Sequence, residues 1–98
     1  MATAVSFLLR PGEVSRWHRV RSEELWLWQG GGQVRLQVGG TGTSPEANET
    51  VEFGAGGHFV VPANVWQTAE PVGDRAVLVA CVVSPGFDFA DFTALGGG

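Results

Sequence analysis

Residues 11–31, PGEVSRWHRVRSEELWLWQGG, decide the fold of this chain. Successive side chains of a β-strand point to opposite faces, so Glu24, Trp26 and Trp28 share one face of a strand in the second half of the stretch. His18 comes before that strand, and a glycine pair ends it. The stretch therefore predicts strands that carry one imidazole and one carboxylate, and it raises the question of whether these two groups bind a metal.

The rest of the sequence also has the pattern of short β-strands. Fifteen glycines and five prolines separate short runs rich in valine, phenylalanine, tryptophan and leucine, a pattern typical of many short strands and not of helices. Residues 76–83 are apolar throughout, which predicts a central strand or one covered by a partner subunit. The eight candidate strands are 5–9, 15–20, 25–29, 34–38, 50–53, 58–61, 66–70 and 76–83. They predict an all-β sandwich or barrel.

Composition limits the size and the partners of the protein. Its 98 residues suffice for one small domain with a single core. Only 16% of the residues are charged, well under the roughly 25% usual in soluble domains, and a surface so poor in charge predicts a homodimer. The formal net charge is −4, with six arginines and no lysine. Such an acidic chain lacks the basic footprint that nucleic acid requires.

The single cysteine and the apolar segments bear on the compartment. Cys81 has no partner for an intramolecular disulfide, which indicates a reducing compartment, and its apolar surroundings predict a core residue. No stretch reaches the about 18 apolar residues of a membrane span, and the first residues lack the features of a signal peptide. The sequence therefore predicts a cytoplasmic protein with no membrane partner.

The spacing of Gly12, His18, Val20, Glu24 and Gly31 resembles the first motif of the cupin superfamily. That motif has a glycine, a His-x-His pair, a glutamate and a closing glycine. The resemblance implies a jelly-roll β-barrel in which the glutamate points inward. In this chain a valine stands where the second histidine of the pair is expected.

A second cupin motif, with a glycine, a Pro-x-Gly turn and a histidine, is matched by Gly56, by Pro62-Ala63-Asn64 and by Gln67. Asn64 replaces the turn glycine, and asparagine tolerates the left-handed backbone conformation that such a turn needs. Gln67 replaces the histidine. The two motifs together make the resemblance extend over most of the chain.

A small cupin family of unassigned function resembles the chain more closely. The resemblance lies in FLLRPGEVSRWHRVRSEELWLW, VVPANVWQTAE and VSPGFDFADF. Members of that family often carry histidines at the positions of Leu27 and Gln29, and they usually begin with a further N-terminal segment that contains an edge strand. The expected fold is therefore a single small all-β cupin jelly-roll barrel over residues 1–95, lacking the usual N-terminal edge segment, with a disordered glycine tail at 96–98.

A metal centre is not expected in this barrel. Cupin-type metal sites need three or four converging ligands, usually imidazoles and one carboxylate. Val20 supplies no ligand atom, Gln67 supplies only a weak amide oxygen, and His58, the other histidine, lies outside the ligand spacing. We therefore predict no metal and no cofactor. A metal-dependent cupin enzyme of the dioxygenase or isomerase type is the alternative.

The remaining polar groups predict a pocket for a small organic molecule. A buried histidine beside a carboxylate forms an acid/base couple near neutral pH, and aromatic walls suit a sugar-like or ring-containing ligand. His18 and Glu24 are the predicted catalytic residues, and Gln67, Trp26 and Trp28 the predicted ligand-binding residues. The hypothesis is a metal-independent enzyme of the isomerase, epimerase or cyclase type. A non-catalytic ligand-binding or interaction module is a further alternative, as is a purely structural pairing of His18 with Glu24.

Three other features have structural interpretations. Residues 84–92, SPGFDFADF, should close one end of the barrel or pack against a partner through their phenylalanines. Arg19 and Arg21 alternate with inward positions and should point away from the interior. Residues 39–48 form the one long polar loop, which is expected to be a flexible hairpin connection or a lid.

Overall fold

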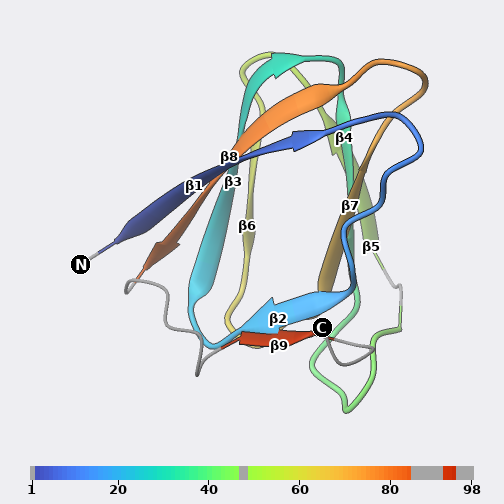
Figure 1. The fold of residues 1–98 in the computed structure, drawn as a ribbon. Coiled ribbons are helices and arrows are strands. Elements are labelled where there is room, and N and C mark those ends of the chain that lie inside the picture. The colour runs from blue at the N-terminus through green and yellow to red at the C-terminus, as the bar shows by residue number, and fades with distance from the viewer. Residues whose placement is uncertain (1, 47–48, 85–91, 95–98) are drawn as a thin grey trace.

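The computed structural model describes residues 2–46, 49–84 and 92–94, and in these ranges the chain forms strands and no helix (Figure 1). No described segment is therefore a helix able to cross a membrane. The strands are β1 (Thr3–Leu9), β2 (His18–Val20), β3 (Glu23–Gly31), β4 (Val34–Val38), β5 (Glu49–Phe53), β6 (His58–Val61), β7 (Gln67–Pro71), β8 (Val77–Ser84) and β9 (Phe92–Ala94). The predicted all-β class is confirmed.

The strands form two antiparallel sheets that face each other (Figure 1). One sheet has the order β1-β8-β3-β6 and the other the order β5-β4-β7-β2-β9. The all-apolar strand β8 lies between β1 and β3, so its predicted central position is confirmed. The sequence also predicted cover on both of its faces, and in this single chain Leu78 on the outer face is 38% exposed.

The core fills the space between the sheets. The two-residue period of each strand sends alternate side chains inward, and the buried cluster consists of such residues from both sheets. Val34 and Leu36 of β4 and Val77 and Val79 of β8 are fully enclosed. Burial of side chains of this size contributes about 1.5–3 kcal/mol each, so the packing between the sheets is the main source of stability.

Apart from shifts of one or two residues at strand ends, the strand pattern differs from the prediction in two places. β2 begins at His18 and not at residue 15, because Ser15 takes a separate role: its backbone N–H donates to the Ala69 carbonyl and its Oγ accepts from the Ala69 N–H. β9 was not predicted, since three residues are too few to show an alternating pattern. The phenylalanines within residues 85–91 and the glycine tail at 96–98 lie outside the described residues.

Two turns depend on backbone conformations that the sequence signalled. Asn64 has a φ of 65°, as its replacement of a turn glycine predicted, and its N–H donates to the Val20 carbonyl at 2.7 Å. Gly31 has a φ of 85°, and a β-carbon there would lie 2.3 Å from the carbonyl oxygen of Ala76. Only glycine fits at position 31, where β3 runs beside the start of β8.

Substitution of this glycine should therefore cost far more than substitution of its neighbour. We expect Gly31→Ala to lower the free energy of unfolding by at least about 2 kcal/mol, from the left-handed backbone and the contact with backbone oxygen. Gly30→Ala is the matched control, because a β-carbon at Gly30 meets nothing within 4 Å, and its effect should stay within about 1 kcal/mol. Urea denaturation measures both, and equal losses would contradict the assignment.

Candidate functional site

A chain of two buried hydrogen bonds joins the two sheets inside the barrel. The Trp26 indole Nε1–H donates to Gln67 Oε1 at 2.6 Å. The Gln67 Nε2–H donates in turn to Glu24 Oε1 at 2.8 Å. Gln67 is 0% exposed and Glu24 only 5%, so neither bond competes with bulk water. The amide of Gln67 is held in one orientation by a donor on one side and an acceptor on the other.

The strand registers bring these residues together. Glu24 and Trp26 are two positions apart in β3, and both point into the barrel. Gln67 points inward from β7, where it pairs with Val38 on one side and with His18 on the other. The β-bulge of β3 falls between Trp28 and Gly30, beyond these residues, so the inward positions predicted from the sequence hold.

Cys81 is a fourth member of this interior group. It lies opposite Trp26 in the pairing of β3 with β8 and is 2% exposed. Burial, with the negative charge of Glu24 and a hydrogen bond to that carboxylate, raises the pKa of the Cys81 thiol well above its ordinary value. The thiol therefore stays protonated, as the predicted core position implies, and is no nucleophile.

His18 has a defined tautomer. Its Nδ1 lies 2.7 Å from the carbonyl oxygen of Arg16, and a carbonyl only accepts, so Nδ1 carries the hydrogen. Nε2 is then the basic nitrogen of the neutral ring. The ring is half-buried at the first residue of β2. An imidazole fixed in this way has the tautomer that a proton-transferring group needs.

His18, Glu24 and Trp26 line one cavity of about 60 Å³. Its other lining residues are apolar or small: Phe7 and Leu9 of β1, with Ser15. Phe7 is 45% exposed although it points toward the interior, so the cavity opens beside β1. Among the described residues no arginine lines it. The cavity therefore offers an imidazole, a carboxylate and an indole face to one small group.

The predicted site residues thus divide into three roles. His18, Glu24 and Trp26 come together at the cavity, whereas Gln67 stands behind it and orients Glu24 and Trp26. Trp28 lies further along β3, where its indole N–H donates to the Gly32 carbonyl at 2.6 Å, and it does not line this cavity.

Sequence reasoning missed the contribution of β1 and of Ser15. Phe7 and Leu9 alternate with Leu8, so the two-residue period could have placed them on one face. Nothing local in the sequence signals that β1 pairs with β8 and so lies beside His18 and Glu24.

A metal ion does not fit this arrangement. Val20 has no ligand atom, and the oxygen of Gln67 is already occupied by Trp26. The described part of the chain holds no cluster of three or more histidine, cysteine or acidic side chains placed to bind one ion. His18 and Glu24 alone do not make up the donor set that a tight transition-metal site needs.

Arg19 points away from the cavity, as the alternation along β2 predicted. Its guanidinium lies 4.6 Å from the ring centre of Trp66 and donates to the Thr41 and Gly42 carbonyls at 3.3 and 2.9 Å. The Trp66 indole N–H donates to the same Gly42 carbonyl at 2.9 Å. The first part of the loop at 39–46 is thus attached to the barrel by two side chains.

Two antiparallel sheets closed around a pocket whose inward histidine and glutamate stand at the cupin spacing define a barrel of the cupin class. The chain belongs to the family Cupin_5, described as cupin superfamily (DUF985), whose model matches residues 1–95. The predicted resemblance to the superfamily and to a small uncharacterised family within it is therefore confirmed. No curated protein matches the chain.

Solved structures show the same fold. A protein of Shewanella oneidensis is 31% identical with a TM-score of 0.84, over 96% of this chain and 61% of that one. A dTDP sugar isomerase of Desulfovibrio desulfuricans is 16% identical with a TM-score of 0.79, over 94% and 62% of the two chains. An oxalate decarboxylase of Lactobacillus farciminis is 21% identical with a TM-score of 0.78, over 96% and 26%. The chain spans about three-fifths of the length of the Shewanella protein, and the two enzymes, at their low identity, show the fold alone.

Removal of the Gln67 amide should destabilise the barrel. Gln67→Leu leaves the Glu24 carboxylate without its amide donor and the Trp26 N–H without its acceptor, so we expect the free energy of unfolding to fall by about 2–4 kcal/mol. Gln37→Leu, on the outer face of β4, is the matched control and should change it by about 0.5 kcal/mol or less. Urea denaturation of both variants tests this, and a small effect of Gln67→Leu would show that the bridge contributes little.

The buried thiol should make stability fall at alkaline pH. Its pKa is raised on folding, so the unfolded chain loses the proton first, and the stabilising contribution disappears as pH rises above the ordinary thiol value of 9.0. Between about pH 8 and about pH 10 the free energy of unfolding of the wild-type protein should fall by about 1.4 kcal/mol more than that of Cys81→Ala. Urea denaturation at each pH measures this difference. If the free energy of unfolding changes with pH in the same way in both proteins, the thiol is not buried in its neutral form.

Proposed function

We propose that this cupin domain binds a small ring-containing or sugar-like organic molecule at the opening beside β1, and that it acts on it without a metal. One observation carries the proposal: His18, Glu24 and Trp26 line the same cavity. Two ionisable groups in so small a barrel are costly unless they are used or fully satisfied. An acid/base pair beside an aromatic wall is suited to isomerase, epimerase or cyclase-type chemistry.

Each residue has a separate task in this proposal. His18 Nε2 takes a proton from the ligand and returns it at a second position, because the Nδ1–H is already engaged by the Arg16 carbonyl. Glu24 faces the same ligand and stabilises the imidazolium that forms. Gln67 is a positioning residue, since it reaches the cavity only through Glu24 and Trp26.

Size and charge restrict the ligand. A cavity of about 60 Å³ admits only one end of a sugar-sized molecule, so the remainder would lie against Phe7 at the opening. Since the described lining contains no arginine, the group that enters should be uncharged. A hydroxylated ring or a hydroxy-carbonyl group meets both conditions, and a phosphate does not.

Tryptophan fluorescence tests binding directly. A panel of monosaccharides, sugar lactones and cyclic hydroxy-ketones should include a compound that changes the emission of the wild-type protein and not that of Trp26→Phe. A response that survives Trp26→Phe places the ligand elsewhere, and no response from any compound speaks against the pocket.

Substitution of each of the two histidines in turn distinguishes catalysis from binding. His18→Ala should lower turnover of the bound compound by at least about a hundredfold, while His58→Ala, an exposed residue of β6, should leave it unchanged. Proton NMR of the compound in deuterated water follows the exchange. Unchanged affinity without turnover in any of the proteins, including His18→Ala/Glu24→Gln, would instead show a binding module.

A further inference from the structure

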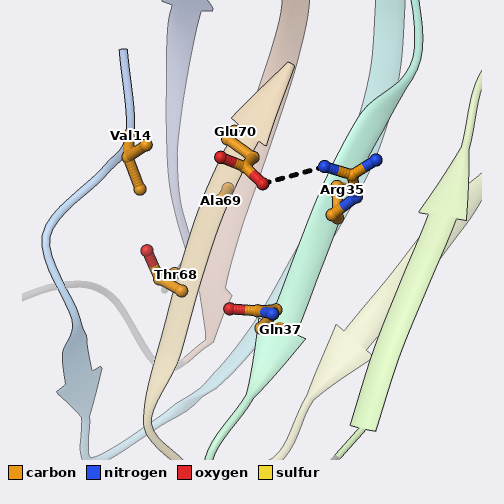
Figure 2. Close-up of a pocket in the computed structure, with 6 residues that line it drawn as sticks. All are labelled: Val14, Arg35, Gln37, Thr68, Ala69 and Glu70. Atoms are coloured by element: carbon orange, nitrogen blue, oxygen red, sulfur yellow. Dashed lines mark hydrogen bonds and ion pairs between the residues drawn. The ribbon is translucent and has the colours of Figure 1, made fainter. Parts of the chain in front are cut away.

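Three hydrogen bonds attach Ser15 to strand β7. Its backbone N–H donates to the Ala69 carbonyl at 2.8 Å, and its Oγ accepts from the Ala69 N–H at 2.7 Å. Its carbonyl accepts a hydrogen bond from the Thr68 hydroxyl. Figure 2 shows Val14, the preceding residue, beside the strand that carries Thr68 and Ala69. The sheet therefore sets the position of Ser15, although this residue lies outside the strands.

These bonds leave the hydroxyl hydrogen of Ser15 unused. A serine hydroxyl has one hydrogen to donate and two lone pairs that accept. One lone pair receives the Ala69 N–H, and a backbone N–H only donates, so the hydroxyl hydrogen is not part of that bond. Among the residues that the structure describes, none accepts it. The side chain is thus held in place by the bond it accepts and keeps its donor for another group.

Ser15 lines the same cavity as His18 and Glu24. A cavity of about 60 Å³ holds only a few non-hydrogen atoms, so these three residues meet the same end of a ligand. The Nδ1–H of His18 and the indole N–H of Trp26 already have acceptors within the protein, and a carboxylate only accepts. Among the described lining residues, the Ser15 hydroxyl is therefore the neutral side-chain donor that remains for a ligand.

We propose that the Ser15 hydroxyl donates to the carbonyl oxygen of the ligand and so selects hydroxy-carbonyl compounds as the substrate class of this site. The inference rests on the function proposed above for His18 and Glu24. A donor that is fixed before the reaction stabilises negative charge that develops on oxygen, and one such donor contributes roughly a hundred- to a thousandfold in rate. A ring that carries hydroxyl groups alone develops no such charge, so it would bind without reacting.

The reaction exchanges the carbonyl and hydroxyl positions of the substrate. His18 Nε2 removes the hydrogen from the carbon that bears the hydroxyl group. The C–H electron pair forms a C=C bond, and the carbonyl π pair moves onto the oxygen, which accepts the Ser15 O–H. The neighbouring hydroxyl then passes its proton to this oxygen and becomes the new carbonyl, while the imidazolium returns the first proton to the old carbonyl carbon. Atoms and electrons balance, so the step needs no oxidant or reductant.

Dihydroxyacetone, a small uncharged hydroxy-ketone, is the probe for this role. In deuterated water its hydrogens next to the carbonyl exchange for deuterium when His18 removes them, and proton NMR follows the loss of their signal. We expect Ser15→Ala to lower kcat at least about a hundredfold and to change KM by less than about threefold. Ser6→Ala is the matched control, because it removes an exposed hydroxyl on the outer side of β1, and it should leave both constants unaltered.

Two further measurements separate the hydroxyl donor from a structural effect of the substitution. Ser15→Thr keeps a hydroxyl and should recover at least about tenfold of the kcat lost in Ser15→Ala, whereas equal losses in the two variants would overturn the proposal. In the wild-type protein, dihydroxyacetone should bind at least about tenfold more tightly than glycerol, which has a hydroxyl in place of the carbonyl. Equal affinity for the two compounds would also overturn it.

The exchange experiment also distinguishes failure of this inference from failure of the proposed function. Exchange that His18→Ala abolishes and Ser15→Ala leaves intact would contradict the role of Ser15 and leave the acid/base function of the site in place. A wild-type protein that exchanges no hydrogen would contradict both.

Discussion

The amide of Gln67 fixes how the two sheets face each other. It takes a hydrogen bond from Trp26 and gives one to Glu24, and all three residues are buried. A slip of β3 by one residue would turn Glu24 and Trp26 outward and put Leu25 and Leu27 in the barrel. The amide would then be buried with neither partner, at a cost of several kcal/mol. The two hydrogen bonds through Gln67 therefore specify the register of β3 more strictly than hydrophobic packing alone would.

The sequence predicted the interior well where a local period or a turn signal existed. Glu24 and Trp26 share a face because they are two residues apart, and Asn64 adopts the left-handed conformation that its place in the turn implied. It could not predict that Phe7 and Leu9 wall the cavity, since that depends on β1 pairing with a strand from the other end of the chain. Trp28 was expected at the same wall, but the Gly32 carbonyl holds its indole N–H, a contact that no two-residue period reveals.

The residues of the pocket limit the reactions this protein could catalyse more than the fold does. Cupin barrels carry unrelated activities, so the superfamily alone assigns none. In this chain Val20 and Gln67 stand at two positions of the ligand motif, and Gln67 serves a structural hydrogen bond in place of metal binding. The histidine that remains has its tautomer set by a backbone carbonyl, as in sites that move protons. What the site can do is thus decided by which atoms are already engaged.

The two faces of β1 border two different parts of the protein. Phe7 and Leu9 point to the cavity, while Leu8 between them points to the outer side of the sheet. Among the described strands β1 pairs with β8 alone and lies at the edge of its sheet, and an edge strand has fewer hydrogen bonds to hold it than a central one. A contact made with Leu8 from outside would therefore also restrict the motion of Phe7 and Leu9, which line the cavity. A contact on the outer side of β1 would then be thermodynamically linked to the ligand affinity of the cavity.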